Sequence, residues 1–150
     1  AHLPDAVIAV IVWCIYELLR NDQGGPEMPT LLALLLQLLS QRSQDLDVQH
    51  ACCSTLGVLV GEDPRLGGLL LEMNGVPLLL ETLRRARASG TAGANLASEC
   101  VGTVASLARG NAMQAEALRR SGVVEALAQC CVDADCGCEE SAVWALGHLA

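Results

Sequence analysis

The residues of this chain best suited to chemistry are four cysteines near its end, Cys130, Cys131, Cys136 and Cys138. Four thiols within nine residues are the kind of cluster that binds zinc or responds to redox conditions. The usual Cys-x-x-Cys ligand pair is missing, however, and adjacent Cys130 and Cys131 point to different sides of a helix. A metal- or redox-responsive domain built on 130–138 is therefore an alternative hypothesis, and no metal ligand is assigned.

Side chains for acid–base catalysis are scarce. The chain has three histidines, His2, His50 and His148, and no lysine. It contains no glycine-rich phosphate loop, no His-Glu-x-x-His zinc motif and no Gly-x-Ser-x-Gly nucleophile elbow. We therefore expect a protein that is not an enzyme by itself and has no cofactor. A regulatory segment of a larger multidomain enzyme is a further alternative.

The composition favours a helical protein from a reducing compartment. Hydrophobic residues make up 52% of the chain, but Phe is absent and the aromatic residues are Trp13, Tyr16 and Trp144. A core of Leu, Val and Ala suits close helix packing. Several of the eight cysteines lie inside apolar runs, where a reduced thiol packs as a small hydrophobe, and no Asn-x-Ser/Thr sequon occurs. We expect an intracellular, cytoplasmic protein, with the nucleus and the cilium left open.

Net charge and the length of the apolar runs restrict the partners. The formal charge of −8 argues against nucleic-acid binding, which requires clustered positive charge, although Arg84, Arg85 and Arg87 form a narrow basic cluster. Apolar runs such as 6–16 and 31–39 are shorter than the about 20 residues that span a bilayer. We expect a protein or peptide partner, no nucleic acid and no membrane span.

Hydrophobic periodicity predicts an all-α fold, because no segment alternates with a period of two for long enough to form a strand. The expected helices cover approximately 4–21, 30–39, 45–60, 64–74, 76–87, 94–109, 113–120, 123–131 and 139–150. Asp45 or Asp47 is expected to cap the third helix and Asp63 the fourth. Gly75 and Gly122 suit left-handed C-terminal caps. The other local predictions are a flexible loop at 88–93 and the ion pairs Glu81–Arg85 and Glu116–Arg120.

Four of the expected helices repeat one apolar stripe. Each has a leucine near its end and small or apolar residues three and seven positions earlier, which lie on the same helical face. The aligned leucines are Leu19, Leu59, Leu107 and Leu149, spaced by 40, 48 and 42 residues. Helical repeats of about 40–47 residues indicate an α-solenoid, whose units bury their cores by stacking on neighbours.

The last repeat resembles the armadillo family. Residues 111–150 contain a short helix ending in Ser-Gly-Val-Val, then Glu-Ala-Leu-Ala, a loop, and Glu-Glu-Ser-Ala-Val-Trp-Ala-Leu-Gly-His-Leu-Ala, in the order of the family's three helices. Residues 63–110 resemble the pattern less closely, and 28–61 lacks a recognisable first helix. HEAT repeats, with two helices per unit, are the near neighbour, but the glycine after a short first helix favours armadillo.

The resemblance implies a right-handed α-solenoid of about three to four partial or complete repeats, forming a single domain over 1–150. Its units would be the third helix of a leading repeat at 4–21, followed by repeats at 28–61, 63–110 and 111–150. We expect the chain to be a fragment of a longer array. Apolar stacking faces would then be exposed at both ends, which would make the isolated piece sticky or marginally stable.

In the family, third helices line a concave groove for peptides or partner segments, so the resemblance implies a non-catalytic protein-interaction scaffold. The groove residues that it implies are Ser54, Val58, Gly102, Ser106, Trp144 and His148. Import receptors of the family repeat a Trp and an Asn four residues later. Here His148 follows Trp144, and the upstream pairs, including Cys14 with Leu18, have neither residue, so binding of nuclear-import signals is not implied. Small and apolar residues suit a partner helix or an apolar peptide.

Three residues on this face also have structural interpretations. Trp144 is expected to pack in the core or between repeats rather than to stack on a ligand. His50, which shares a face with Ser54, is expected to be exposed to solvent. His148 is expected to be a surface or packing residue.

Overall fold

The computed structural model describes residues 3–21, 25–132 and 138–150, which are almost entirely helical. No strand occurs among these residues, and the all-α prediction is confirmed. The helices of the described residues are α1 (Asp5–Asn21), α2 (Met28–Gln41), α3 (Leu46–Glu62), α4 (Pro64–Glu72), α5 (Gly75–Ala88), the short 3-10 helix η1 (Gly90–Gly93), α6 (Ala94–Gly110), α7 (Ala112–Arg119), α8 (Val123–Val132) and α9 (Glu139–Leu149).

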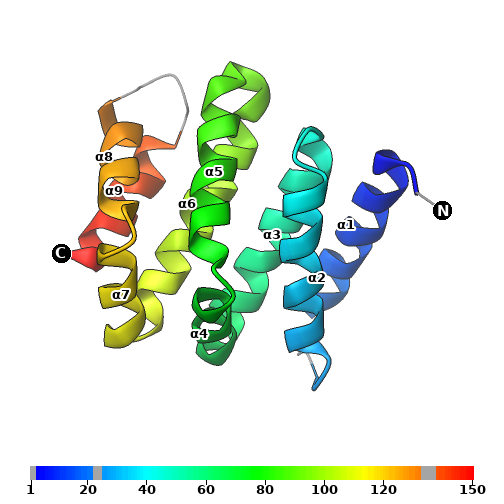
Figure 1. The fold of residues 1–150 in the computed structure, drawn as a ribbon, viewed down its shortest axis with the longest axis horizontal. Helices are drawn as coiled ribbons and strands as arrows, with labels where there is room; N and C mark the ends of the chain where they lie inside the picture. The colour runs from blue at the N-terminus through cyan, green and yellow to red at the C-terminus, as the bar shows by residue number, and fades with distance from the viewer. Residues whose placement is uncertain (1–2, 22–24, 133–137) are drawn as a thin grey trace.

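The helices follow one another in chain order along the long axis of the molecule (Figure 1). One row is formed by α1, α3, α6 and α9, with α3 packed between α1 and α6, and α6 packed between α3 and α9. A second layer, in which α2 packs on α3 and α5 packs on α6, lies in front of this row in Figure 1. The four helices that share the apolar stripe are therefore the ones that pack against one another.

A core of leucine, valine, alanine and cysteine runs through both layers. The aligned leucines contribute to it: Leu59, Leu107 and Leu149 are at most 4% exposed, whereas Leu19 in the end helix α1 is only half-buried. The largest fully buried side chains are leucines apart from Val48 and Gln49. This composition allows the helices to approach closely, as the sequence predicts.

Side-chain caps fix several helix starts where they are predicted. Asp45 begins α3, and its Oδ1 accepts a hydrogen bond from the backbone N–H of Val48 at 2.9 Å. Asp63 begins α4, and its Oδ1 accepts from the N–H of Arg65 at 3.0 Å. Each cap satisfies one of the N–H groups that the first helical turn leaves without a backbone partner.

Removing the first of these caps gives a local stability prediction. Asp45→Ala is expected to lower the free energy of unfolding by about 1 kcal/mol, because the N–H of Val48 loses its acceptor. Urea denaturation followed by circular dichroism measures the change. Asp47→Ala is the matched control, since Asp47 lies in the first turn of α3 but is not the cap. Equal losses in the two variants would contradict the assignment of the cap to Asp45.

Two local predictions are wrong in detail. The left-handed residue before α5 is Asn74, with φ of 57°, and Gly75 already belongs to the helix. Gly75 is favoured for a different reason, because a Cβ there would lie 2.7 Å from Leu70 Cδ2. The second glycine, Gly122, does adopt the predicted left-handed conformation, with φ of 87°. The segment 88–93, expected as a loop, ends α5 and then forms η1.

No single helix in the described residues combines the length and the apolar composition of a membrane span. Only as a pair do α4 and α5 meet those criteria, and that pair is bent by 86° at the break between them. The apolar runs singled out in the sequence lie in α1 and α2, both of which pack against α3.

Candidate binding surface

The outward sides of α1, α3, α6 and α9 share one register, and we call their residues the ridge surface. In each helix the positions lie about four residues apart, a spacing that keeps them on one face. The main residues are Val10, Ile11, Cys14, Leu18, His50, Val58, Glu99, Gly102, Ser106, Arg109, Glu140, Trp144 and His148. Because the four helices pack side by side, these residues form one strip along the row.

Five of the six predicted groove residues reach this surface, and one does not. Trp144 and His148 are exposed, and Val58, Gly102 and Ser106 are half-buried. A methyl group built at Gly102 would meet no atom within 4 Å, so the surface there is open. Ser54 is only 4% exposed, and the prediction that it offers a contact side chain is wrong.

Trp144 is the centre of a small cluster at the α9 end of the strip. The residue is 49% exposed, and its ring packs edge-on against His148, with ring centroids 4.5 Å apart. The Arg109 guanidinium carbon, from α6, lies 5.1 Å from the centre of the indole. A cation at this distance is attracted to the face of a tryptophan ring. The sequence predicts that Trp144 packs in the core or between repeats; the side chain is not in the core, but it does contact the neighbouring helix α6 through Arg109.

A second cluster joins α1, α3 and α6. The Trp13 ring packs edge-on against Tyr16 and His50, with centroid distances of 5.3 Å and 5.2 Å. His50 Nε2 lies 3.9 Å from Glu99 Oε1, a contact that becomes an ion pair when the imidazole is protonated. His50 is therefore half-buried between neighbours rather than exposed as predicted.

At the α1 end the strip is apolar. Leu18 is 70% exposed, Val10 61% and Ile11 45%, and Cys14 is exposed beside them. In the middle of the row a hollow of about 320 Å³ lies between α3, α4 and α6, and Ser106 and Arg109 are among its lining residues. Exposed aliphatic side chains are therefore found at the α1 end, and aromatic clusters lie at both ends.

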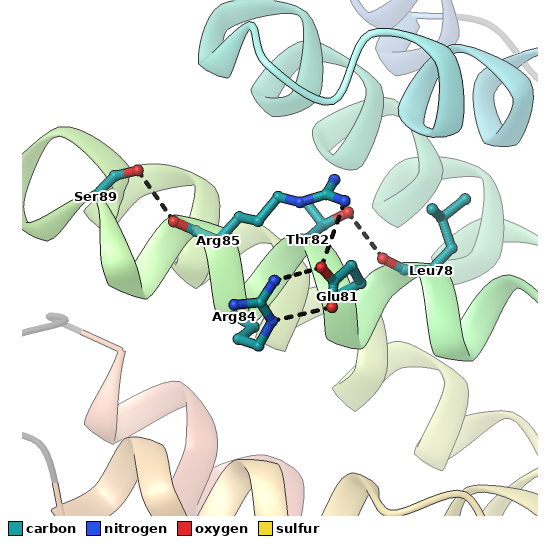
Figure 2. A network of polar contacts seen from close by, with 6 residues as sticks. All are labelled: Leu78, Glu81, Thr82, Arg84, Arg85 and Ser89. Carbon is teal, nitrogen blue, oxygen red and sulfur yellow. Dashed lines mark hydrogen bonds and ion pairs between the residues drawn. The ribbon is translucent and has the colours of Figure 1, made fainter.

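The basic cluster predicted on α5 is partly neutralised. Figure 2 shows Glu81 between two of its arginines: Arg84 Nε donates to Glu81 Oε2 at 3.0 Å, and Arg85 Nη2 lies 3.4 Å from Glu81 Oε1. The hydrogen bonds from Arg84 hold the pKa of Glu81 below its usual value. The predicted Glu81–Arg85 pair is confirmed, as is the pair Glu116–Arg120 at 3.0 Å.

The predicted cysteine cluster is described only in part. Cys130 and Cys138 are buried and Cys131 is half-buried, while Cys136 lies outside the described residues. Across the ranges that the structure describes, no three His, Cys, Asp or Glu side chains are placed to hold a metal ion.

A different thiol pair is close. Cys53 Sγ of α3 and Cys100 Sγ of α6 lie 3.7 Å apart in the core. Their contact, followed by burial, raises the pKa of Cys53 well above 9.0, and burial raises the pKa of neighbouring Cys52 to about 12. Such thiols stay protonated at neutral pH and are poor nucleophiles. Sequence reasoning missed the pair, although Cys53 lies six positions before Leu59 and Cys100 lies seven positions before Leu107.

A larger cavity, of about 970 Å³, shares Val58 with the ridge surface but is not lined by residues of the two aromatic clusters. It lies where α1 ends, α2 begins, and α3 continues into α4. Its lining residues are Leu19, Gly25, Pro26, Met28, Pro29, Val58, Leu59, Glu62, Asp63, Arg65, Leu66, Gly68, Leu69 and Glu72. Apolar side chains form much of the wall, and three carboxylates and one guanidinium lie among them.

Comparison of the chain with models of known families, with curated proteins and with solved structures finds no match.

Proposed function

We propose that the chain is an armadillo-like α-solenoid and works as a non-catalytic scaffold that binds a partner segment along the ridge surface. The recurrence of helix lengths supports the solenoid: α1, α3 and α6 each have 17 residues, and α2 and α5 each have 14. Short helices precede the later units, as α4 before α5 and α7 before α8. These short first helices favour armadillo units over two-helix HEAT units.

In this proposal α1 is the third helix of a leading repeat, and the repeats at 28–61, 63–110 and 111–150 follow. Contacts between equivalent helices support the division, because each third helix packs on the next. Among the described residues no first helix precedes α2 in the repeat at 28–61. Six residues separate α1 from α2, whereas twelve separate α3 from α5 and α6 from α8.

The observation that carries the binding function is the exposure of large apolar and aromatic groups in one register. Trp144 keeps 49% of its area in solvent while Arg109 and His148 hold its ring in place. Exposed apolar strips of this kind mark interaction sites, and Trp and Arg are enriched among the residues that dominate binding energy. The aliphatic α1 end suits the apolar face of a partner helix.

A Trp/Asn ladder of the import-receptor kind is absent from the ridge surface. At the positions equivalent to Trp144, the other three helices carry Cys14, Ser54 and Gly102. An indole therefore occurs once at this repeated position, and we do not propose nuclear-import signals as ligands.

The test uses peptides selected on the intact chain from a random peptide library. Trp144→Ala is expected to weaken their binding by about tenfold or more, the loss typical of an interface hot spot. Val132→Ala, at an exposed position on α8 outside the strip, is the matched control and should bind as the parent chain does. Ser106→Glu should also weaken binding, since it places a charge on the same strip. Isothermal titration calorimetry gives the affinities, and thermal denaturation confirms that each variant folds. Parental affinity in well-folded Trp144→Ala would refute the ridge surface as the binding site.

A further inference from the structure

The cavity of about 970 Å³ occupies the place that a first helix would fill in the repeat at 28–61. The later first helices, α4 and α7, lie at the lower edge of the molecule in Figure 1, and α2 begins at the same edge. By comparison with α7, which contacts α4, α6, α8 and α9, the missing helix would contact α1, α2, α3 and α4. The cavity walls come from the ends of those four elements.

Helix α7 is the first helix of the proposed repeat at 111–150, and its contacts indicate what a helix bound in the cavity would need. On its inner face the side chains of Ala115 and Leu118 are buried. Gln114 Nε2 donates to the carbonyl oxygen of Pro64 at the start of α4, at 2.7 Å. Arg119 Nη1 donates to the carbonyl of Leu149 at the end of α9, at 3.0 Å. Helix α7 therefore has an apolar face and a basic residue at its C-terminal end. The other first helix, α4, shares the buried apolar face but has no basic residue in its last turn.

The cavity complements that pattern. Leu19, Leu66 and Leu69 contribute to an apolar wall. Asp63 and Arg65 pair with each other at 3.1 Å, which leaves two carboxylates on the rim, Glu62 at the end of α3 and Glu72 at the end of α4. Neither of the two has a cationic partner among the described residues. In the register of the aligned leucines the counterpart of Leu149 is Leu59, whose carbonyl already accepts from the N–H of Asp63 at 3.1 Å. A basic residue of the occupant would therefore face the carboxylates of Glu62 and Glu72.

We propose that the cavity is a second binding site, which takes a short amphipathic helix of a partner protein with leucine-type residues on one face and an arginine or lysine near its C-terminal end. The occupant completes the repeat at 28–61 in trans. The proposal rests on the repeat arrangement proposed above. The cavity shares Val58 with the ridge surface, but Trp144 and its neighbours do not line it, so the two sites can be tested separately.

The probe is a fluorescent peptide with the sequence of residues 111–122, which contains α7, its cap and two arginines. It is expected to bind the intact chain, and Leu69→Glu should weaken binding by about tenfold or more, because a charge would be buried against the peptide's apolar face. Leu34→Glu, at an exposed leucine of α2 away from the cavity, is the matched control. Fluorescence anisotropy measures affinity, and circular dichroism measures folding. Absence of binding, or equal binding by the two variants, would overturn the proposal.

A charge exchange keeps the test decisive if Leu69→Glu fails to fold. Glu62→Arg with Glu72→Arg changes two exposed side chains and should weaken binding of the parent peptide. The same variant should recover binding of a peptide carrying Arg119→Glu and Arg120→Glu, and added salt should reduce both effects. If the exchanged pair failed to bind, the basic residue would be removed from the proposal.

Concentration-dependent dimerisation of the chain alone, abolished by Leu69→Glu or by the double variant, would identify a second copy as the occupant and overturn the assignment to a partner protein. Loss of ridge binding in Trp144→Ala with peptide binding intact would separate the two sites.

Discussion

Raising the pH from 9 to 12 is expected to lower the free energy of unfolding of this domain, and burial of Cys52 alone accounts for about 1.4 kcal/mol per pH unit. Burial raises the pKa of this thiol from 9.0 to about 12 in the folded chain. Above pH 9 the unfolded chain releases the proton while the folded chain retains it. The unfolded state is therefore favoured progressively until the folded thiol also ionises. Below pH 9 both states hold the proton, and this dependence disappears.

Cys53 acts in the same direction. Its contact with Cys100 and its burial raise its pKa, so its ionisation also opposes folding in the alkaline range. The composition makes the effect easy to isolate, because the chain has no lysine and one tyrosine, Tyr16. The other side chains that change charge in this window are mainly the remaining cysteines of the chain, so the contribution of Cys52 is isolated by its own replacement.

The measurement is urea denaturation at several pH values from about 8 to about 12, under reducing conditions. Cys52→Ala should show a shallower loss of stability with pH than the parent chain, whatever its absolute stability. Cys14→Ala is the matched control, because Cys14 is exposed in α1, and it should keep the parental slope. A parental slope in Cys52→Ala would show that this thiol is not the source of the dependence.

Local signals predicted the helices well because helix ends depend on neighbouring residues. Asp45 and Asp63 cap the helices that they precede, and Gly122 takes the left-handed conformation expected after a short helix. The error at Gly75 is instructive. Glycine is favoured there by the nearness of Leu70, and Asn74 supplies the left-handed turn, which asparagine tolerates better than most residues.

The candidate site was less predictable because exposure depends on distant helices. Ser54 and Trp144 occupy equivalent positions, but α3 packs between α1 and α6, whereas in the described residues α9 has one neighbour in the row. Ser54 is buried and Trp144 is not. The contacts of Arg109 with Trp144 and of His50 with Glu99 join residues of different helices, so helical spacing alone does not reveal them. The sequence of 28–61 lacks a recognisable first helix, but the cavity beside α2 could be found only from the fold.

Replacing Leu107 in the middle of the row is expected to cost about 2–5 kcal/mol, the range for a leucine removed from a closed core. Leu107 is fully buried in α6, and its Cδ2 would lie 3.2 Å from a Cβ built at Gly67 of α4. Leu19 holds the equivalent position in α1 but is half-buried and lines the cavity. Leu19→Ala should therefore cost clearly less than Leu107→Ala, although the two changes are chemically identical.

The same substitution tests whether the chain is an array or a single cooperative core. In an array each unit is stabilised by its neighbours, so weakening α6 should uncouple the two ends. Trp13 lies in α1 and Trp144 in α9, and each can be observed alone after the other is replaced by phenylalanine. We expect both reporters to give one urea midpoint in the parent chain and separate midpoints once Leu107→Ala is introduced. Coincident midpoints with an unchanged denaturant slope would favour a single core and remove the physical basis for treating the helices as stacked repeats.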